Sequence, residues 1–274
     1  MNGTSHMGRH GSEALIVKAI TFVLLAMLLA PIFMVIAMSF TAATTLQFPP
    51  PALSLRWYAE IWTLLTGPDA AFARLAESLL VSLEIAAAAS IVCLLAGVPA
   101  SYALVRLSFR GRGLIEELLG LPIVFPTVVL GVALLMLISQ SGFDLGMGQI
   151  VIAHAIIGLP FMMRNCMESM RGIDPVLQEA ARTLGASGVR AFFDIVLPLA
   201  RQGIVSGALL VFIISFNEFT LSYFLYTIDV FPLSIWLFQQ SNTSFSPAIF
   251  AISTLTILIT IGVILAVDLA GRRR

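Results

Sequence analysis

Two acidic residues in apolar surroundings are the first candidates for chemistry. Glu218 lies in the segment SFNEFTLSYF, beside Asn217, and Glu84 lies in a long aliphatic run. Ionisable side chains at membrane depth are costly, so they usually face a cavity, a polar partner or a transported solute. Three rings flank Glu218 at the spacing of one helical face: Phe216, Phe219 and Tyr223. Rings beside a carboxylate suit an organic cation. The structural alternative is a polar pair that packs against a partner subunit.

Other reactive side chains form no catalytic or metal-binding pattern. The cysteines Cys93 and Cys166 lack a C-x-x-C spacing, and the three histidines are scattered. We interpret His154 as a hydrogen-bonded interior residue. Lys18 is the only lysine, and no P-loop motif surrounds it. We therefore predict a protein that is not an enzyme, with no catalytic residue, no metal site and no cofactor of its own.

The composition excludes an ordinary soluble domain. Of the 274 residues, 59% are hydrophobic and 11% are charged, whereas soluble domains are about 45–50% apolar and about 25% charged. The formal net charge is zero, which gives no basic field for nucleic acid. The sequence predicts an all-α polytopic membrane protein surrounded by lipid.

Apolar runs near the ~20 residues that a spanning helix needs occur six times. The predicted spans are Ala14–Phe40, Ser78–Val105, Leu118–Ile138, Gln149–Met163, Gly203–Tyr226 and Ala248–Val267. With both termini in the cytoplasm, thirteen of the fifteen cations lie inside, as the positive-inside rule requires. The two outside cations are Arg56 and Arg74. We expect Glu84 to pair with Arg74 or to reach the outer interface.

The segments around these spans complete the predicted organisation. We expect residues 1–13 to be a disordered cytoplasmic N-terminus, residues 14–270 a single transmembrane domain, and residues 271–274 a basic cytoplasmic tail. Outside the spans, Ser54–Trp62 reads as a short interfacial helix, and the VFPLSIWLF segment as an interfacial or re-entrant one. Gly203 and Gly207 fit a small-xxx-small pattern for close helix packing.

The inside loop, residues 165–201, is longer than a helical bundle requires. Asp174 is a good helix N-cap, Pro175 suits the first helical position, and Gly185 suits a left-handed C-terminal cap. A second helix, Ser187–Val196, should end near Pro198. The sequence predicts a helix–turn–helix on the cytoplasmic face.

This helix–turn–helix has two interpretations. It could be a linker hairpin that packs on its own spans. Alternatively, Ala180 and Ala181 beside Glu179 leave a small-residue face that suits close docking into another protein.

The segment EAARTLGASGVRAFFDIVLP closely resembles the EAA loop of ATP-binding-cassette (ABC) importer permeases. The matching positions are Glu179, Ala180, Ala181, Gly185, Phe192 or Phe193, Ile195, Leu197 and Pro198. The resemblance implies the type I ABC importer permease fold in a bacterial inner membrane. It also implies that the first loop helix couples the permease to ATP-binding subunits, two copies of which hold the ATP and magnesium.

Two further partners follow from the resemblance: a second permease subunit, expected to be a paralogue, and a periplasmic substrate-binding protein.

From residue 72 onward the chain looks like the second permease of spermidine/putrescine-type systems, on the segments Leu104–Gly113 and Leu121–Pro126. This favours a polyamine or related cationic amine. Relatives with the same pattern carry aminophosphonates, opines, thiamine or ferric ion. An ion-coupled secondary transporter subunit is the alternative from a different class.

Overall fold

The computed structural model describes residues 7–66, 70–243 and 246–272. These residues form helices and loops that divide into two compact units. One unit comprises Met1–Gly67 with Thr243–Leu258, and the other comprises Pro68–Asn242 with Ile259–Arg274.

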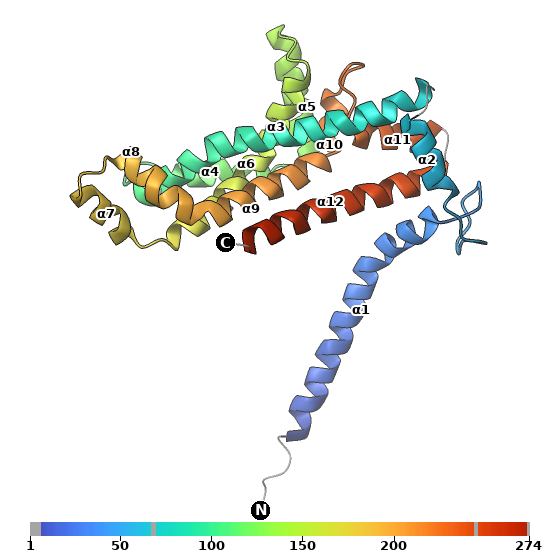
Figure 1. Ribbon diagram of the computed structural model, residues 1–274, viewed down its shortest axis with the longest axis horizontal. Coiled ribbons are helices and arrows are strands. Elements are labelled where there is room, and N and C mark those ends of the chain that lie inside the picture. Colours follow the sequence, from blue (N-terminus) through green and yellow to red (C-terminus); the bar gives the residue numbers. More distant parts are fainter. Residues whose placement is uncertain (1–6, 67–69, 244–245, 273–274) are drawn as a thin grey trace, which may run out of the picture. The chain divides into compact units, whose positions relative to one another are not determined.

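The first unit contains α1 (Met7–Ser39), α2 (Arg56–Thr66) and the start of α12 (Ala248–Arg272) (Figure 1). Helix α1 begins before the predicted span, because an apolar helix readily propagates into preceding residues. Residues 7–13 are therefore helical rather than disordered, and residues 1–6 lie outside the described part. The Tyr58 hydroxyl donates to Ser39 Oγ at 2.7 Å and thereby joins α2 to the end of α1. Helix α2 confirms the short helix predicted after Ser54.

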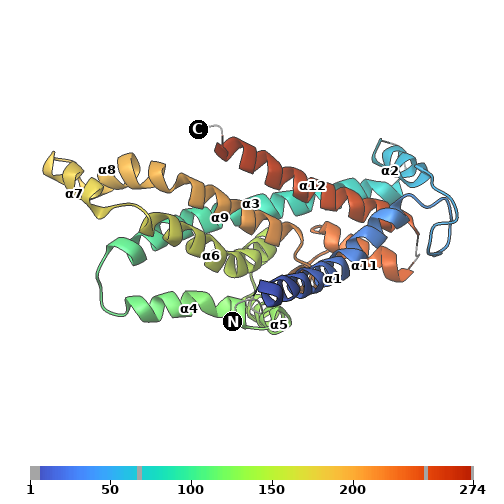
Figure 2. The same cartoon turned by 90° about the horizontal axis from the view of Figure 1, so that it is seen from below.

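In the second unit, α3 (Ala70–Arg106), α6 (Met147–Arg171) and α9 (Leu197–Phe216) pack side by side (Figures 1 and 2). Their contact surface is apolar, and its fully buried residues include Cys93, Met162, Cys166, Ala200 and Val211. This three-helix packing forms the scaffold on which the candidate sites lie.

Helices α6 and α9 approach closely because two glycines lie at their contact. A Cβ on Gly203 would lie 2.4 Å from Ser169 Cβ, and one on Gly207 would lie 2.8 Å from Met162 Sδ. Real side chains do not tolerate such separations. The prediction that these glycines serve packing is confirmed.

The third predicted span is not one straight helix. Helix α4 (Arg112–Val124) and helix α5 (Thr127–Ser141) meet at a bend of 102°. Phe125 between them is extended, with φ −72° and ψ 137°. Pro126 explains this conformation, because a proline pushes the preceding residue out of the helical region. Helix α4 runs alongside α6, with which it is in contact (Figure 2).

The fourth predicted span was too short. Helix α6 continues eight residues past Met163, to Arg171, into what the sequence suggested was loop. The pattern explains the extension, since Cys166, Met167 and Met170 are buried while Arg164 and Glu168 are exposed. An amphipathic turn of this kind continues a helix even where its mean hydropathy falls.

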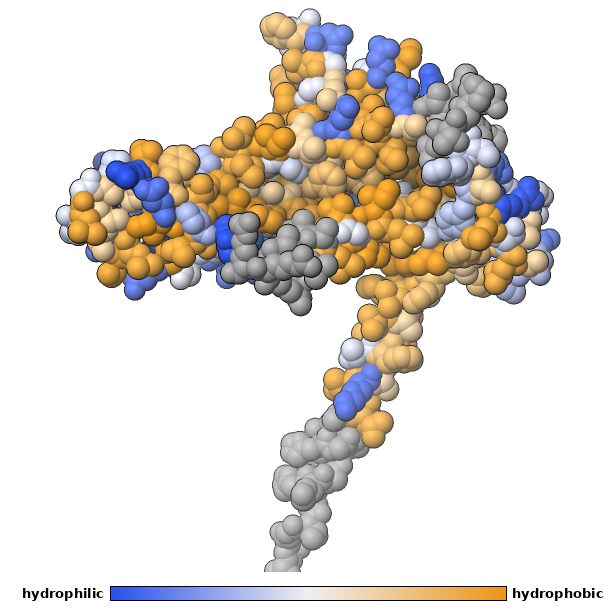
Figure 3. All heavy atoms as spheres, viewed as in Figure 1, coloured by the Kyte–Doolittle hydropathy of each residue, from blue (hydrophilic) through white to orange (hydrophobic). Residues whose placement is uncertain are grey.

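Five described helices are long and apolar enough to cross a membrane, and the bent pair α4–α5 makes six if it counts as one span. The remaining predicted short segment forms α11 (Leu233–Thr243), which follows Pro232. Apolar side chains cover much of the surface that is visible in Figure 3. The fold is an all-helical, multi-span membrane protein.

Candidate functional site

The loop after α6 contains the predicted first helix, α7 (Pro175–Thr183). The Val176 N–H donates to Asp174 Oδ1 at 2.9 Å, so Asp174 is the N-cap, and Pro175 occupies the first turn. At the other end Gly185 has φ +91°, and the Ala186 N–H donates to the Ala181 carbonyl at 3.0 Å. This left-handed termination favours glycine. Both predicted ends of α7 are confirmed.

The second loop helix does not end at Pro198. Helix α8 (Gly188–Ala191) continues through a π-helical turn, η1 (Phe192–Val196), into α9. The Leu197 N–H donates to the Phe192 carbonyl, five residues back, so the hydrogen-bond register changes just before the proline. Pro198 then lies in the first turn of α9, where its missing N–H matters little.

We call residues 172–196, between α6 and α9, the coupling segment. Helix α7 has no buried residue, and Glu179, Ala180 and Gly185 are exposed while Ala181 is half-buried. Two apolar side chains near the turn, Leu184 and Val189, are 90% and 69% exposed. Pro198 is also exposed, but it belongs to α9.

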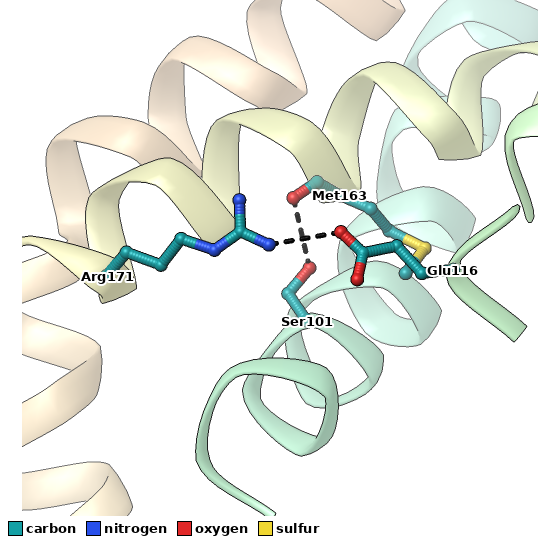
Figure 4. A network of polar contacts seen from close by, with 4 residues as sticks. All are labelled: Ser101, Glu116, Met163 and Arg171. Atoms are coloured by element: carbon teal, nitrogen blue, oxygen red, sulfur yellow. Dashed lines mark hydrogen bonds and ion pairs between the residues drawn. The ribbon is translucent and has the colours of Figure 1, made fainter. Parts of the chain in front are cut away.

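Helices α3 and α4 both contact the C-terminal half of α6 before this segment (Figure 4). The Ser101 hydroxyl on α3 donates to the Met163 carbonyl at 3.3 Å, and Arg171 Nη2 lies 3.0 Å from Glu116 Oε1 on α4. A hollow of about 310 Å³ between α4 and α6 is lined by both partners of that ion pair. Because the pair is exposed, it contributes only about 0–1 kcal/mol of stability.

The predicted fifth span is interrupted at Glu218. Helix α9 ends at Phe216, and a new short helix, α10 (Thr220–Leu225), begins after the break. The half-buried Glu218 carboxylate accepts a hydrogen bond from the Leu221 N–H at 3.1 Å. A carboxylate at a helix N-terminus satisfies a free N–H and favours a helix start. Glu218 is therefore a capping residue at a helix break.

The three rings predicted to share one face are divided by this break. Phe216 stacks on Phe212 at 6.1 Å between ring centroids. Phe219 lies 5.5 Å from the Tyr223 ring and 5.0 Å from the Phe238 ring of α11. The single-face interpretation was wrong, because it assumed a continuous helix. The exposed Asn217 does not point to a shared site either, since its Nδ2 donates to its own helix, at the Ile213 carbonyl.

His154 on α6 lies at the centre of a buried polar cluster that the sequence did not assemble. Its Nδ1 lies 2.8 Å from Ser215 Oγ and its Nε2 lies 3.2 Å from Ser222 Oγ. The polar cluster comprises Ser82, His154, Ser215, Glu218, Ser222 and Ser234. It lines a hollow too narrow for a small solute. The prediction that His154 is a hydrogen-bonded interior residue is confirmed.

One signal could have indicated the serine partners. Ser215 and Ser222 are seven residues apart and flank Glu218, so a helix would place them on the same side. The Ser222 and Ser234 hydroxyls also donate to the Glu218 carbonyl, at 3.0 and 3.3 Å. These bonds join α6, α9, α10 and α11 around the break.

The expected pairing of Glu84 with Arg74 is not formed. Both residues lie on α3, ten positions apart, which at ~1.5 Å per residue separates them by about 15 Å. The Arg74 guanidinium instead lies 5.7 Å from the centre of the Phe231 ring. Glu84 is exposed. Among the residues that the structure describes, no group of three or more His, Cys, Asp or Glu could hold a metal ion.

Comparison with known families decides the class of this protein. The family model described as "Binding-protein-dependent transport system inner membrane component" matches residues 89–274, which include the whole coupling segment. The chain belongs to this family of ABC importer permeases. The assignment disfavours the ion-coupled secondary transporter, and it places the permease among multi-pass inner-membrane proteins.

Curated relatives of the permease include proteins named for polyamine transport and for molybdate or tungstate transport. The spermidine/putrescine permease PotC of Haemophilus influenzae is 28% identical over 256 residues, which cover 93% of this chain and 96% of PotC. The molybdate/tungstate permease WtpB of Pyrococcus abyssi is 40% identical over 49% of this chain and 54% of WtpB. The molybdenum permease ModB of Escherichia coli is 35% identical over 52% of this chain and 68% of ModB.

Solved structures show the same fold. A chain of a bacterial ABC transporter that imports alginate aligns with a TM-score of 0.69 at 18% identity, over 97% of the permease and 99% of that chain. A chain of the MetNI methionine transporter, in an inward-facing conformation, aligns with a TM-score of 0.59 at 19% identity, over 73% of the permease and 93% of that chain.

Proposed function

We propose that this permease is driven by separate ATP-binding subunits that dock on α7. The main support comes from the coupling segment. Helix α7 contributes no residue to the apolar core, yet both of its ends are capped. A rigid helix with exposed apolar neighbours is a suitable element for a partner's groove. ATP and magnesium would be bound by two copies of the partner, and this chain would hydrolyse nothing itself.

The rest of the assembly follows from the same proposal. A second permease subunit, a paralogue of this one, would complete the pathway, and a periplasmic protein would deliver the solute. Both termini would lie in the cytoplasm, which places the coupling segment on the side where ATP is available. The distribution of arginines supports this orientation.

The docking role can be tested at Gly185. Its φ of +91° is unfavourable for a residue with a Cβ, yet nothing lies within 4 Å of the position that a Cβ would take. Gly185→Val should therefore distort the end of α7 by backbone strain of about 1–2 kcal/mol and leave the membrane helices folded. We expect the variant permease to reach the membrane but to lose its ATP-binding subunit during co-purification. Undiminished co-purification and transport would contradict the docking role.

A matched control is Gly188→Val, three residues later in the sequence, beyond the turn. Gly188 begins α8, has an ordinary φ and likewise has nothing within 4 Å of an added Cβ. The same side chain at this position should keep the ATP-binding subunit bound. The pair of variants separates backbone strain at Gly185 from added bulk near the docking surface.

For the substrate we propose a polyamine or related cationic amine. The similarity to PotC extends over nearly the whole chain, and the half-buried Glu218 adjoins Phe219 in the sequence, whose ring lies 5.5 Å from that of Tyr223. A carboxylate and aromatic faces are the groups that bind organic ammonium ions. Glu218, Asn217, Phe216, Phe219 and Tyr223 remain the proposed pathway residues, in two neighbouring groups rather than on one helical face.

Molybdate or tungstate is the second candidate. The relatives that carry these names are more nearly identical to this chain, over about half of its length. This second proposal rests on those relatives, because the His154 ring and the Ser215 and Ser222 hydroxyls already hydrogen-bond one another around a hollow too narrow for a solute.

Uptake in cells separates the two candidates. Labelled spermidine, putrescine and molybdate would each be supplied at low micromolar concentration to cells with and without the gene. We expect deletion to abolish spermidine or putrescine uptake, with recovery from the wild-type gene but not from Gly185→Val. Loss of molybdate uptake alone would replace the polyamine proposal with the oxyanion one and would leave the docking role in place.

A further inference from the structure

The last turn of α3 holds the point where α6 ends and the coupling segment begins. Arg106 Nη2 donates to the Met170 carbonyl at 3.0 Å and to the Ile173 carbonyl at 2.6 Å. The last carbonyls of a helix lack partners within it, and a cation there also interacts favourably with the helix dipole. Arg106 therefore satisfies the C-terminus of α6 and ties the following residues to α3.

Tyr102, one turn before Arg106, contacts two later parts of the same segment. Gln178 on α7 donates from its Nε2 to the Tyr102 hydroxyl. The Phe192 ring, at the start of η1, packs edge-on against the Tyr102 ring with centroids 4.8 Å apart. Residues four apart lie on one helical face. One face of α3 thus holds the beginning, the middle and the end of the coupling segment.

We propose that Tyr102 and Arg106 are positioning residues that transmit movement of α7 to the transmembrane helices. This inference rests on the proposed function, because it takes α7 as the docking element. Helix α7 buries no residue of its own, so its orientation depends on a few attachment points. Energetic coupling between distant sites is carried by hydrogen bonds and packed side chains that move together. The contacts of Tyr102 and Arg106 provide such a connection to α3, which packs against both α6 and α9.

The test uses the complete transporter, with both permease subunits, the ATP-binding subunits and the binding protein, in lipid nanodiscs. Three quantities are measured: the ATP-binding subunit retained per permease, the basal rate of ATP hydrolysis, and the factor by which the binding protein stimulates hydrolysis. The variants are Arg106→Gln and Tyr102→Phe. Arg106→Lys is the conservative variant, and Arg110→Gln, at an exposed arginine four residues later, is the matched control.

We expect Arg106→Gln to retain the ATP-binding subunit and basal hydrolysis but to lose stimulation about tenfold, within the usual range of coupling between sites. Tyr102→Phe keeps its ring against Phe192 and should lose less, about threefold. Arg106→Lys should fall between Arg106→Gln and wild type, because it keeps the charge with a single donor group. Arg110→Gln should behave as wild type. Unchanged stimulation in Arg106→Gln and Tyr102→Phe would overturn the proposal. Loss of the ATP-binding subunit from both variants would also overturn it, because the two residues would then shape the docking surface.

A double variant tests the route through α7. If Tyr102 acts through Gln178, then Tyr102→Phe combined with Gln178→Ala should reduce stimulation no further than the more severe single variant. Additive losses would contradict that route. Gly185→Val reports on docking independently. If this variant keeps the ATP-binding subunit, the proposed docking on α7 is wrong. Loss of stimulation in Arg106→Gln would still identify α3 as the connection.

Discussion

In the coupling segment Leu184 and Val189 leave 90% and 69% of their surface exposed, whereas His154 and Ser222 in the polar cluster are 2% and 0% exposed. The coupling segment is attached to the bundle at a few points and presents the rest of its surface outward. The polar cluster is enclosed, and its side chains hydrogen-bond to one another and to a backbone carbonyl. Both regions are polar interruptions in an apolar chain, but they differ in what surrounds them.

The difference indicates where substitutions should act. A buried polar group that loses its partner retains its full desolvation penalty, so changes in the polar cluster should destabilise the fold. An exposed group stays in contact with water and carries no such desolvation penalty. Changes in the coupling segment should therefore affect partner binding and leave the fold intact. Variants in the two regions can therefore be distinguished by measuring folded protein and bound ATP-binding subunit separately.

The largest effect is expected where helices touch most closely. Gly203→Val places a side chain against Ser169 Cβ and the Asn165 carbonyl, at 2.4 and 2.6 Å from the new Cβ. Overpacking against backbone should cost about 3 kcal/mol or more and leave little folded permease in size-exclusion chromatography. Gly188→Val, with nothing within 4 Å, should elute as wild type. Equal yields of the two variants would contradict the close approach of α6 and α9.

A smaller but still substantial loss is expected at the centre of the polar cluster. His154→Leu removes both ring hydrogen bonds and leaves the Ser215 and Ser222 hydroxyls buried without this partner, which should cost about 2–3 kcal/mol. The measurement is thermal unfolding of the purified permease in detergent. Adding Ser215→Ala to His154→Leu should recover part of the loss, because the Ser215 hydroxyl is then no longer buried without His154, whereas Ser222 keeps its hydrogen bond to the Glu218 carbonyl. A further fall in stability would show that Ser215 contributes independently of the histidine.

At Glu218 the charge and the capping role can be separated. Glu218→Gln keeps an oxygen to accept from the Leu221 N–H, so stability should change by less than about 1 kcal/mol. If the carboxylate binds a cationic amine, spermidine uptake should fall about tenfold, equivalent to about 1.4 kcal/mol of lost interaction. Unchanged uptake of the transported amine would end the cation-site hypothesis and leave Glu218 as a helix cap.

The smallest effect is expected at the start of the coupling segment. Asp174→Ala removes the cap of the Val176 N–H and should weaken the first turn of α7 by about 1 kcal/mol. Thermal stability should stay near wild type, while the amount of co-purified ATP-binding subunit falls several-fold. Asp174→Asn retains a capping oxygen and should restore binding. A stability loss as large as that of His154→Leu would break the distinction between the two regions.

Local signals predicted α7 well and the transmembrane breaks poorly. Asp174, Pro175 and Gly185 act within one or two turns of chain, so their effect is visible in sequence. Pro198 led to the wrong prediction that the second loop helix ends there, because a proline usually ends a helix. The π-turn before Pro198 lets the helix continue, and such a turn has no sequence signature. Pro126 did mark a real break, yet the prolines by themselves gave no way to tell a bend of 102° from a modest kink.

The remaining errors came from contacts between distant residues. The end of α6 was missed because Met167 and Met170 become apolar contacts only when α3, α4 and α9 pack around them. The break at Glu218 was missed because it is stabilised from outside its own helix, by Ser234 on α11 and by His154 on α6. No periodicity within residues 203–226 could reveal either partner.

The sequence by itself determined the class of the protein, because hydropathy and the distribution of arginines act through the membrane rather than through specific contacts. It also determined α7 and the permease family, because capping residues and the EAA pattern are local. Tertiary structure alone decided how these parts are connected. It placed Arg106 on the carbonyls of Met170 and Ile173, brought His154 between Ser215 and Ser222, and joined Ser234 to the Glu218 carbonyl at the helix break. Each of these arrangements depends on groups far apart in the chain, whose meeting only the packing of helices can specify.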